Sequence, residues 1–438
     1  MSFSATKRHQ ARIGSHLKGE ENIYSLNKHA LGPGELAESE WLKAGLSGPD
    51  MTKIRQYRLK RVREKLVEHD YAGILLYDPL NIRYATDSTN MSLWTSHNAA
   101  RYALVMTEGP VIMFEFDAHE FLSNHNPLIT EVRHAVTYLY FTAGDKSKER
   151  AKIWASEIVD IVNEYGKGNK NLAIDHCAPE GIHELQINGL KLKNGEEVME
   201  LATLITSEDE IKAMKRSIFA CEKSIELMRN HFKPGITEQE LWSRFQMEAV
   251  SRGAEWIETR LLASGPRANP WYQECSSRPI LSGELMGFDT DLVGSYGYCT
   301  DMSRTWLCGD EKPTDVQKEI YTMGYDQIQN NMQLLKPGTT FKELTLNSQE
   351  YLKDEFRHYS VLFHGVGLCD EFPAIPFSWE LNENSFDGVL KPGMVMCVET
   401  YVGRYSGGPG VKLEEQVLIT NNGYELLTSY PFESDLLL

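Results

Sequence analysis

Acidic side chains recur at short spacing in the segment FDTDLVGSYGYCTDMSRTW. Asp289 and Asp291 are two residues apart, so on a strand both carboxylates project from one face. GSYG at 294–297 predicts a turn, and the following residues continue as a partner strand. This hairpin places Thr290 roughly opposite Asp301, so Asp301 lies diagonally between the two earlier acids if it shares their face. Three such carboxylates repel one another unless cations lie between them. If the face is solvated instead, the same acids need no metal.

Three further polar residues lie in apolar strand patterns later in the chain: His364 in VLFHGVG, Glu399 in VMCVET and Glu414 in GVKLEEQVLIT. An unpaired carboxylate in such a strand is costly, although any one of these residues is more often structural than a ligand. Glu415 should point to the opposite face from Glu414. The candidate metal ligands are Asp289, Asp291, Asp301, His364, Glu399 and Glu414. This oxygen-rich set with one imidazole suits two divalent ions of the Mn, Fe, Co or Zn type.

Asp370 stands in HGVGLCDEFP, where a metal-dependent hydrolase would more comfortably place a second His. An ionised carboxylate cannot donate a hydrogen bond to an oxyanion, but it can accept a proton or hold a cation. Asp370 is therefore a candidate general base, the alternative being that it caps a turn. Its neighbour Cys369 has no motif that supports a nucleophilic role.

The strands that carry these residues belong to the second of two predicted domains. Residues 1–50 predict an N-terminal arm, and helical patterns alternate with apolar strands over 51–204, which indicates a compact α/β domain. The third part, 205–438, begins with a long helix whose start is marked by Ser207 and Glu210, the pattern of a capping box.

Two similar segments suggest that this last domain is internally duplicated. HFKPGITEQELW and LLKPGTTFKELT both place a Lys-Pro-Gly turn before a capping box, formed by Thr237 with Glu240 and by Thr340 with Glu343. LKPGM recurs once more at 390–394, so chance is an alternative. The shared capping boxes favour a pseudo-twofold repeat.

Composition narrows the class of protein. The 438 residues carry a formal net charge of −17, which argues against a nucleic-acid partner and gives no reason to expect binding to an anionic membrane. No apolar run approaches the roughly 18 residues that span a bilayer, and no signal peptide is recognisable. Seven cysteines without a CxxC pair are typical of reduced thiols, so we expect a cytoplasmic protein.

The ordered set of acids and His resembles the pita-bread family of methionine aminopeptidase, prolidase, aminopeptidase P and creatinase, over nearly everything from residue 51 to the end. The resemblance implies an α+β chain: a creatinase-like N-terminal α/β domain, then a pita-bread catalytic domain with internal pseudo-twofold symmetry. The metallopeptidases of this family bind two metals through two Asp, one His and two Glu. The matching positions are Asp291 or Asp289, Asp301, His364, Glu399 and Glu414.

The chain departs from the peptidase pattern in three places. Asp301 is ten residues from Asp291 and twelve from Asp289, whereas the two Asp ligands of the peptidases have a spacing between these values. The segment ASGPRANPWYQECSS lacks the His that assists the leaving amine in peptidases. Asp370 replaces the His that follows their HGxG turn. Amide hydrolysis would therefore lack the two His side chains that assist it in the peptidases.

Several segments, among them EWIETRLLASGPRANPW and HGVGLCDEFP, are similar to one branch of the family, the dimethylsulfoniopropionate lyases of marine bacteria. The resemblance implies a homodimer with a metal pair, for which we expect iron, with Mn, Co and Zn as alternatives, and it implies cleavage of a small zwitterionic substrate to acrylate and dimethyl sulfide. It also implies that Asp370 is the catalytic base and that Trp94 and Tyr359 line the substrate pocket. Two alternatives stay open: an Xaa-Pro peptidase or small-amide hydrolase of the same fold, and a binding protein with a decayed peptidase fold.

Overall fold

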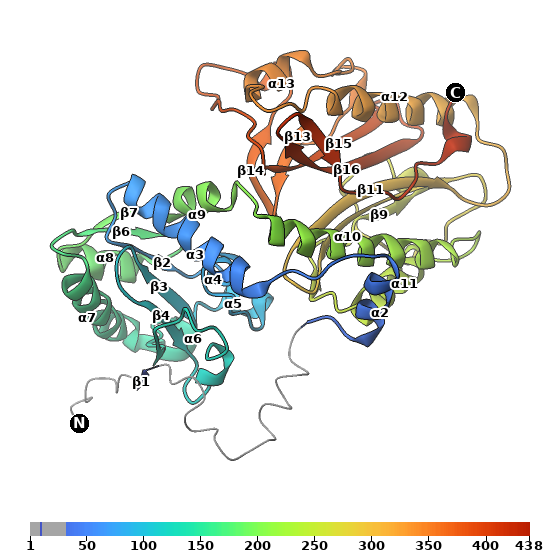
Figure 1. The fold of residues 1–438 in the computed structure, drawn as a ribbon. Helices are drawn as coiled ribbons and strands as arrows, with labels where there is room; N and C mark the ends of the chain where they lie inside the picture. The colour runs from blue at the N-terminus through green and yellow to red at the C-terminus, as the bar shows by residue number, and fades with distance from the viewer. Residues whose placement is uncertain (1–8, 11–31) are drawn as a thin grey trace. The chain divides into compact units, whose positions relative to one another are not determined.

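The computed structural model describes residues 9–10 and 32–438, so most of the predicted N-terminal arm lies outside the described residues. Their chain forms two compact units. The first contains Asp50–Thr203 with strand β1 (His9–Gln10), and the second contains Leu204–Leu438 with the residues from 32 to 49 (Figure 1). Among the described helices, none combines the length and the apolar character that crossing a bilayer requires.

The first unit is a mixed sheet with the strand order β1-β5-β4-β3-β2-β6-β7. The central strands GILL, YALVM and VIMFE are buried at every residue, because helices and loops cover both faces of the sheet. These three are β2 (Gly73–Leu76), β3 (Tyr102–Met106) and β4 (Val111–Glu115), and the strands beside them are β5 (Glu131–His134), β6 (Asn171–Ile174) and β7 (Lys191–Asn194). Its helices are α3 (Met51–Glu68), α4 (Pro79–Thr86), α5 (Ser92–His97), α6 (Tyr140–Ala143), α7 (Ser147–Tyr165), α8 (Pro179–Ile187) and α9 (Gly195–Thr203).

The segment before Asp50 packs on the second unit through helix α2 (Glu35–Lys43). Trp41 of this helix is buried, and the guanidinium of Arg216 lies 4.6 Å from the centre of its ring. Arg252 forms a two-pronged ion pair with Glu40, with N–O distances of 2.8 and 2.9 Å. The end of the predicted arm is therefore an integral part of the second unit.

The second unit contains two sheets. One has the order β11-β10-β8 with β9 added on β10, and the other has the order β14-β13-β15-β16-β17 with β12 added on β15. Its strands are β8 (Trp256–Ile257), β9 (Leu262–Ser264), β10 (Leu285–Val293), β11 (Cys299–Leu307), β12 (Phe356–Arg357), β13 (Phe363–Val366), β14 (Asp370–Ile375), β15 (Val395–Arg404), β16 (Gly410–Thr420) and β17 (Gly423–Leu426). Its helices are α10 (Glu208–Arg229), α11 (Glu238–Ser251), α12 (Asp315–Met332) and α13 (Phe341–Asn347).

The two halves of this unit repeat one another. Each half begins with a helix pair, α10–α11 or α12–α13, and the second helix of each pair starts with a complete capping box at Thr237 or Thr340. Thr237 forms an antiparallel bridge with Pro279, and Thr340 forms the same bridge with Val389. A long hairpin follows in each half, β10–β11 and then β15–β16. The predicted α+β pita-bread fold with pseudo-twofold symmetry is confirmed.

The register of the β10–β11 hairpin differs from the prediction by one residue. Asp291 is paired directly with Asp301, and Thr290 is paired with Met302 rather than with Asp301. The reason is that Tyr298 joins the turn, since the backbone N–H of Gly294 donates to the Tyr298 carbonyl at 2.9 Å. The loop is therefore one residue longer than the predicted turn, and the two acids face each other across the ladder.

Candidate metal centre

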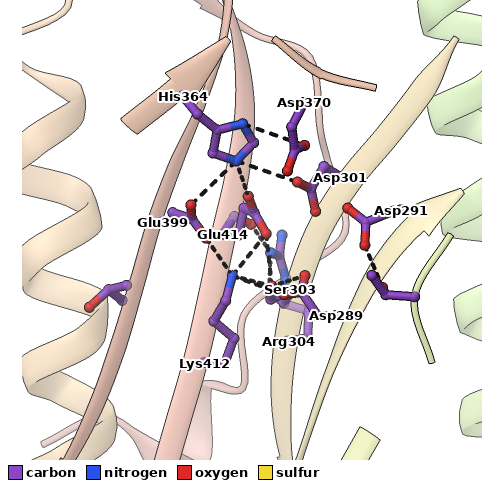
Figure 2. A network of polar contacts seen from close by, with 12 residues as sticks. Asp289, Asp291, Asp301, Ser303, Arg304, His364, Asp370, Glu399, Lys412 and Glu414 are labelled. Carbon is purple, nitrogen blue, oxygen red and sulfur yellow. Dashed lines mark hydrogen bonds and ion pairs between the residues drawn. The ribbon is translucent and has the colours of Figure 1, made fainter. Parts of the chain in front are cut away.

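The two hairpins bring their polar residues together where β11 packs against β16. The contact is held by the Thr305 hydroxyl, which donates to the Lys412 carbonyl at 2.9 Å and accepts from the Lys412 backbone N–H at 3.1 Å. Strand β13 approaches from β15 and contributes His364, which is paired with Cys397 in the ladder. Side chains from β10, β11, β13, β15 and β16 thus meet in one buried cluster, and Figure 2 shows the residues of this cluster.

His364 lies at the centre of the predicted ligands. Its Nε2 atom is 3.3 Å from Glu399 Oε1 and 3.5 Å from both Asp301 Oδ2 and Glu414 Oε1. Its Nδ1 atom is 2.9 Å from the Gly365 carbonyl, a hydrogen bond that leaves Nε2 for a metal. The structure therefore brings together His364, Asp301, Glu399 and Glu414, as a metal site requires.

Asp289 and Asp291 have different surroundings, although both lie on the same face of β10. Asp289 is paired with Ser303 in the ladder and accepts a hydrogen bond from its hydroxyl. Asp291 faces Asp301 and accepts a hydrogen bond from the hydroxyl of Thr259. The ligand oxygens of Asp291, Asp301 and Asp370 lie within 4.8 Å of one another, which makes a second group able to hold an ion.

Lys412 is a member of the cluster that sequence reasoning missed. Its Nζ atom is 2.8 Å from Glu399 Oε2, 3.0 Å from Glu414 Oε2 and 3.3 Å from Asp289 Oδ2. The signal was present in the sequence, because Lys412 precedes Glu414 by two residues and must share its face on a strand.

The chemistry of the cluster fits a metal. Asp301 Oδ1, Glu399 Oε1 and Glu414 Oε1 are buried and accept no well-formed hydrogen bond among the described residues, and the His364 ring is the polar group that faces the two glutamate oxygens. Buried polar atoms are nearly always satisfied, so three such oxygens around one imidazole form a donor set that fits a divalent cation. The thiol of Cys397 lies with Asp301, His364 and Glu414 in a group whose ligand atoms are within 4.8 Å of one another.

The charges of the cluster also call for cations. Burial raises the pKa of Asp289 to about 6, and burial and the neighbouring acids raise the pKa of Asp291 and of Glu399 to about 8. Burial disfavours charge on Glu414 too, but Lys412 and His364 hold its pKa below the ordinary value. Burial likewise opposes charge on His364, but Glu399 and the other acids raise its pKa to about 10.

Asp370 lies at the edge of the cluster, at the start of β14. Its side chain is 63% exposed, and its Oδ1 atom is 3.6 Å from His364 Nδ1. The turn between β13 and β14 is held by its neighbour, since the backbone N–H of Leu368 donates to Glu371 Oε1 at 2.9 Å. Asp370 is thus accessible to a small molecule while it lies beside His364.

The two aromatic residues predicted for substrate binding lie in different units. The Tyr359 ring stacks on Tyr272 with 5.3 Å between ring centres, and the Lys412 Nζ atom is 4.2 Å from its centre. Tyr359 is therefore a neighbour of the metal cluster. Trp94 lies on α5 of the first unit, packs on Phe116 and is 38% exposed, and its role in the pocket stays a prediction.

Glu415 lies on the other face of β16, as predicted. It forms an ion pair with Arg304 at 2.8 Å and accepts a hydrogen bond from the hydroxyl of Thr428. Arg304 also donates to the carbonyl oxygen of Glu414 at 2.6 Å. The two consecutive glutamates therefore lie in different environments, and of the two only Glu414 belongs to the candidate metal cluster.

Comparison with known proteins agrees with this architecture. Residues 58–202 match the Creatinase/Prolidase N-terminal domain, and residues 212–421 match Metallopeptidase family M24. An Xaa-Pro dipeptidase from Bacillus anthracis has the same fold, with a TM-score of 0.70 at 23% identity over 86% of this chain and 99% of that one. The prolidase from Pyrococcus horikoshii has a TM-score of 0.67 at 23% identity, again covering 86% and 99%. The chain is therefore a two-domain member of the creatinase and prolidase class.

Within this class, two relatives match almost end to end. The chain is 42% identical to the dimethylsulfoniopropionate lyase DddP of Roseovarius nubinhibens over 99% of both chains. It is also 42% identical to the DddP of Roseobacter denitrificans, over 99% of this chain and 98% of that protein. The chain belongs to the DddP family, and the prediction of a lyase branch is confirmed at the level of the family.

Proposed function

We propose that this protein is a metal-dependent carbon–sulfur lyase that cleaves dimethylsulfoniopropionate to acrylate and dimethyl sulfide by β-elimination. Full-length similarity to two DddP lyases supports the substrate. The observation that carries the reaction type is the exposed carboxylate of Asp370 beside His364, at the position where the resembling peptidases have a His. A carboxylate there favours removal of a proton over stabilisation of an oxyanion.

The metal ligands of the proposal are the six predicted residues: Asp289, Asp291, Asp301, His364, Glu399 and Glu414. The orphaned buried oxygens among them support two divalent transition-metal ions, of which iron is our first choice and Mn, Co and Zn are compatible. Ions held by these residues would supply Lewis-acid chemistry, favouring a bound substrate carboxylate and negative charge on the carbon next to it.

Asp370 acts as the general base in this proposal. Its carboxylate accepts the proton from the carbon next to the substrate carboxylate. The electron pair of that C–H bond forms the double bond of acrylate, and the C–S bond breaks with its electrons on sulfur. The sulfonium therefore leaves as neutral dimethyl sulfide, and the proton stays on Asp370 until solvent takes it from the exposed side chain.

The rings of Trp94 and Tyr359 are the proposed partners of the sulfonium. A desolvated cation over an aromatic ring gains on the order of 1–2 kcal/mol. Tyr359 is adjacent to the candidate metal cluster, since its ring centre lies 4.2 Å from the Lys412 ammonium. A homodimer in the cytoplasm completes the proposal, in keeping with the family resemblance and with the scattered cysteines.

The decisive experiment compares two substrates. The metal-loaded protein is incubated with dimethylsulfoniopropionate, and dimethyl sulfide is measured in the headspace, while a parallel sample receives an Xaa-Pro dipeptide. We expect sulfide release that depends on metal and no dipeptide cleavage. Dipeptide cleavage without sulfide release would contradict the proposal and identify a hydrolase. If the metal-loaded protein forms neither product, the result would contradict the proposal and favour a binding protein with a decayed peptidase fold.

A further inference from the structure

Lys412 is a completely buried lysine in the middle of strand β16. Lysine is among the residues least often buried in full, because its charge must be compensated inside the protein. An ammonium group has three N–H donors, and all three are used here. They donate to Ser303 Oγ at 2.8 Å, to Glu399 Oε2 at 2.8 Å and to Glu414 Oε2 at 3.0 Å.

Glu399 and Glu414 are shared between Lys412 and His364. Each glutamate directs its Oε1 atom toward His364 Nε2 and its Oε2 atom toward Lys412 Nζ (Figure 2). The two glutamates are also paired with each other in the β15–β16 ladder. The ammonium therefore fixes one oxygen of each glutamate, and this fixes where the other oxygen points.

Asp289 is drawn into the same arrangement. Its Oδ2 atom is 3.3 Å from Lys412 Nζ, and its other oxygen accepts from Ser303, whose own oxygen accepts from Lys412. The ring of Tyr359 closes the remaining side of the ammonium. Four elements thus meet at Lys412, and the charge has a partner in each direction.

We propose that Lys412 is a positioning residue of the metal centre. Its ammonium group holds Glu399 Oε2, Glu414 Oε2 and Asp289 Oδ2 in place, so that the site keeps its shape before metal binds. This inference rests on the metal site of the proposed function and not on its substrate. Orienting groups behind metal ligands are known to matter about 10–100-fold in metal affinity.

Loss of the Lys412 charge should therefore affect metal-free and metal-loaded protein differently. Without metal, Lys412 and His364 are the cations within reach of the acids in the described cluster, so neutralising Lys412 leaves buried carboxylates that repel one another. With metal bound, the ions compensate the same carboxylates. If Lys412 had only a structural role in the core, its replacement would instead lower the stability of metal-free and metal-loaded protein by the same amount.

The test compares Lys412→Met with Lys215→Met, which removes a surface lysine paired with Glu425 in the same unit. Full-length proteins are melted in chelator and again after loading with Mn²⁺, and Mn²⁺ affinity is measured by titration with elemental analysis. For Lys412→Met, we expect the melting temperature of metal-free protein to fall on the order of 10 °C. We expect a clearly smaller fall with Mn²⁺ and at least a roughly 10-fold weaker Mn²⁺ affinity. Lys215→Met should match the wild type in all three measurements.

Lys412→Gln and Lys412→Arg complete the series. The Gln variant keeps polar contacts without charge and should behave like Lys412→Met, whereas the Arg variant keeps the charge and should recover part of the Mn²⁺ affinity. An equal loss of stability with and without Mn²⁺, together with wild-type affinity, would overturn the proposal. Failure of both neutral variants to fold even in Mn²⁺ counts as equal loss. None of these readouts depends on sulfide release, so failure of the substrate assignment would leave them unchanged.

Discussion

Asp370→Asn is the substitution that bears most directly on the reaction. The change is nearly isosteric and removes only the ability to accept a proton. Because the side chain is 63% exposed and the turn is held by Glu371, we expect the free energy of unfolding to change by no more than about 0.5 kcal/mol. A positioned general base contributes about 10²- to 10⁴-fold to the rate. The loss in kcat should therefore be of this size, equivalent to about 3–5 kcal/mol in the barrier.

The assay combines three measurements on one preparation: kcat and KM for dimethyl sulfide release, metal content, and the midpoint of urea unfolding. Glu371→Gln is the matched control, since it neutralises the adjacent acid while its amide oxygen can still accept from Leu368. We expect the control to retain wild-type kcat. Loss of metal in Asp370→Asn would refute the reasoning and make Asp370 a ligand beside Asp291 and Asp301. Retention of kcat would place the base elsewhere.

Three further outcomes follow from the contacts around the site. Arg304→Met should lower the free energy of unfolding by about 3–5 kcal/mol in urea titrations, because Glu415 would stay buried without its partner. Arg404→Met is the control: it removes a more exposed ion pair and should lower the free energy of unfolding by less than about 1 kcal/mol. Thr340→Ala should cost about 0.5–2 kcal/mol by the same measurement through loss of the capping box, and a neutral result would refute the cap. Tyr359→Leu should raise KM for the sulfonium substrate about 10-fold while metal content stays constant, and an unchanged KM would exclude its ring from binding.

The sequence predicted the fold well where a pattern had one physical interpretation. The capping boxes at Thr237 and Thr340 could be recognised because a Thr followed three residues later by Glu satisfies two backbone N–H groups at once. The hairpin register was harder, because the alternation of side chains does not reveal the length of a turn. Tyr298 extends the strand pattern in the sequence, yet its carbonyl closes the turn, and this shifted the pairing of Asp301 by one residue.

The acids and the imidazole that the sequence singled out lie together in the structure, whereas Lys412 was not among the predicted residues. Carboxylates inside apolar strands are conspicuous because they need a cation. Lys412 was overlooked because lysine in a strand is usually solvated, and only its two-residue offset from Glu414 places it in the interior. The contacts of Ser303 with Asp289 and Glu414 depend on how two separate hairpins pack, and no local pattern reports that packing.

The pair Glu414–Glu415 has a consequence for how the site assembles. Consecutive glutamates make β16 ambiguous, because a slip of one residue would present Glu415 to the metal face and send Glu414 outward. Arg304 removes this ambiguity, since it contacts the carboxylate of Glu415 and the main-chain oxygen of Glu414 at the same time. A slipped strand would bury that guanidinium without its carboxylate, at several kcal/mol. The contacts of Glu415 on one face of β16 therefore fix the alignment that places Glu414 among the candidate ligands on the other face.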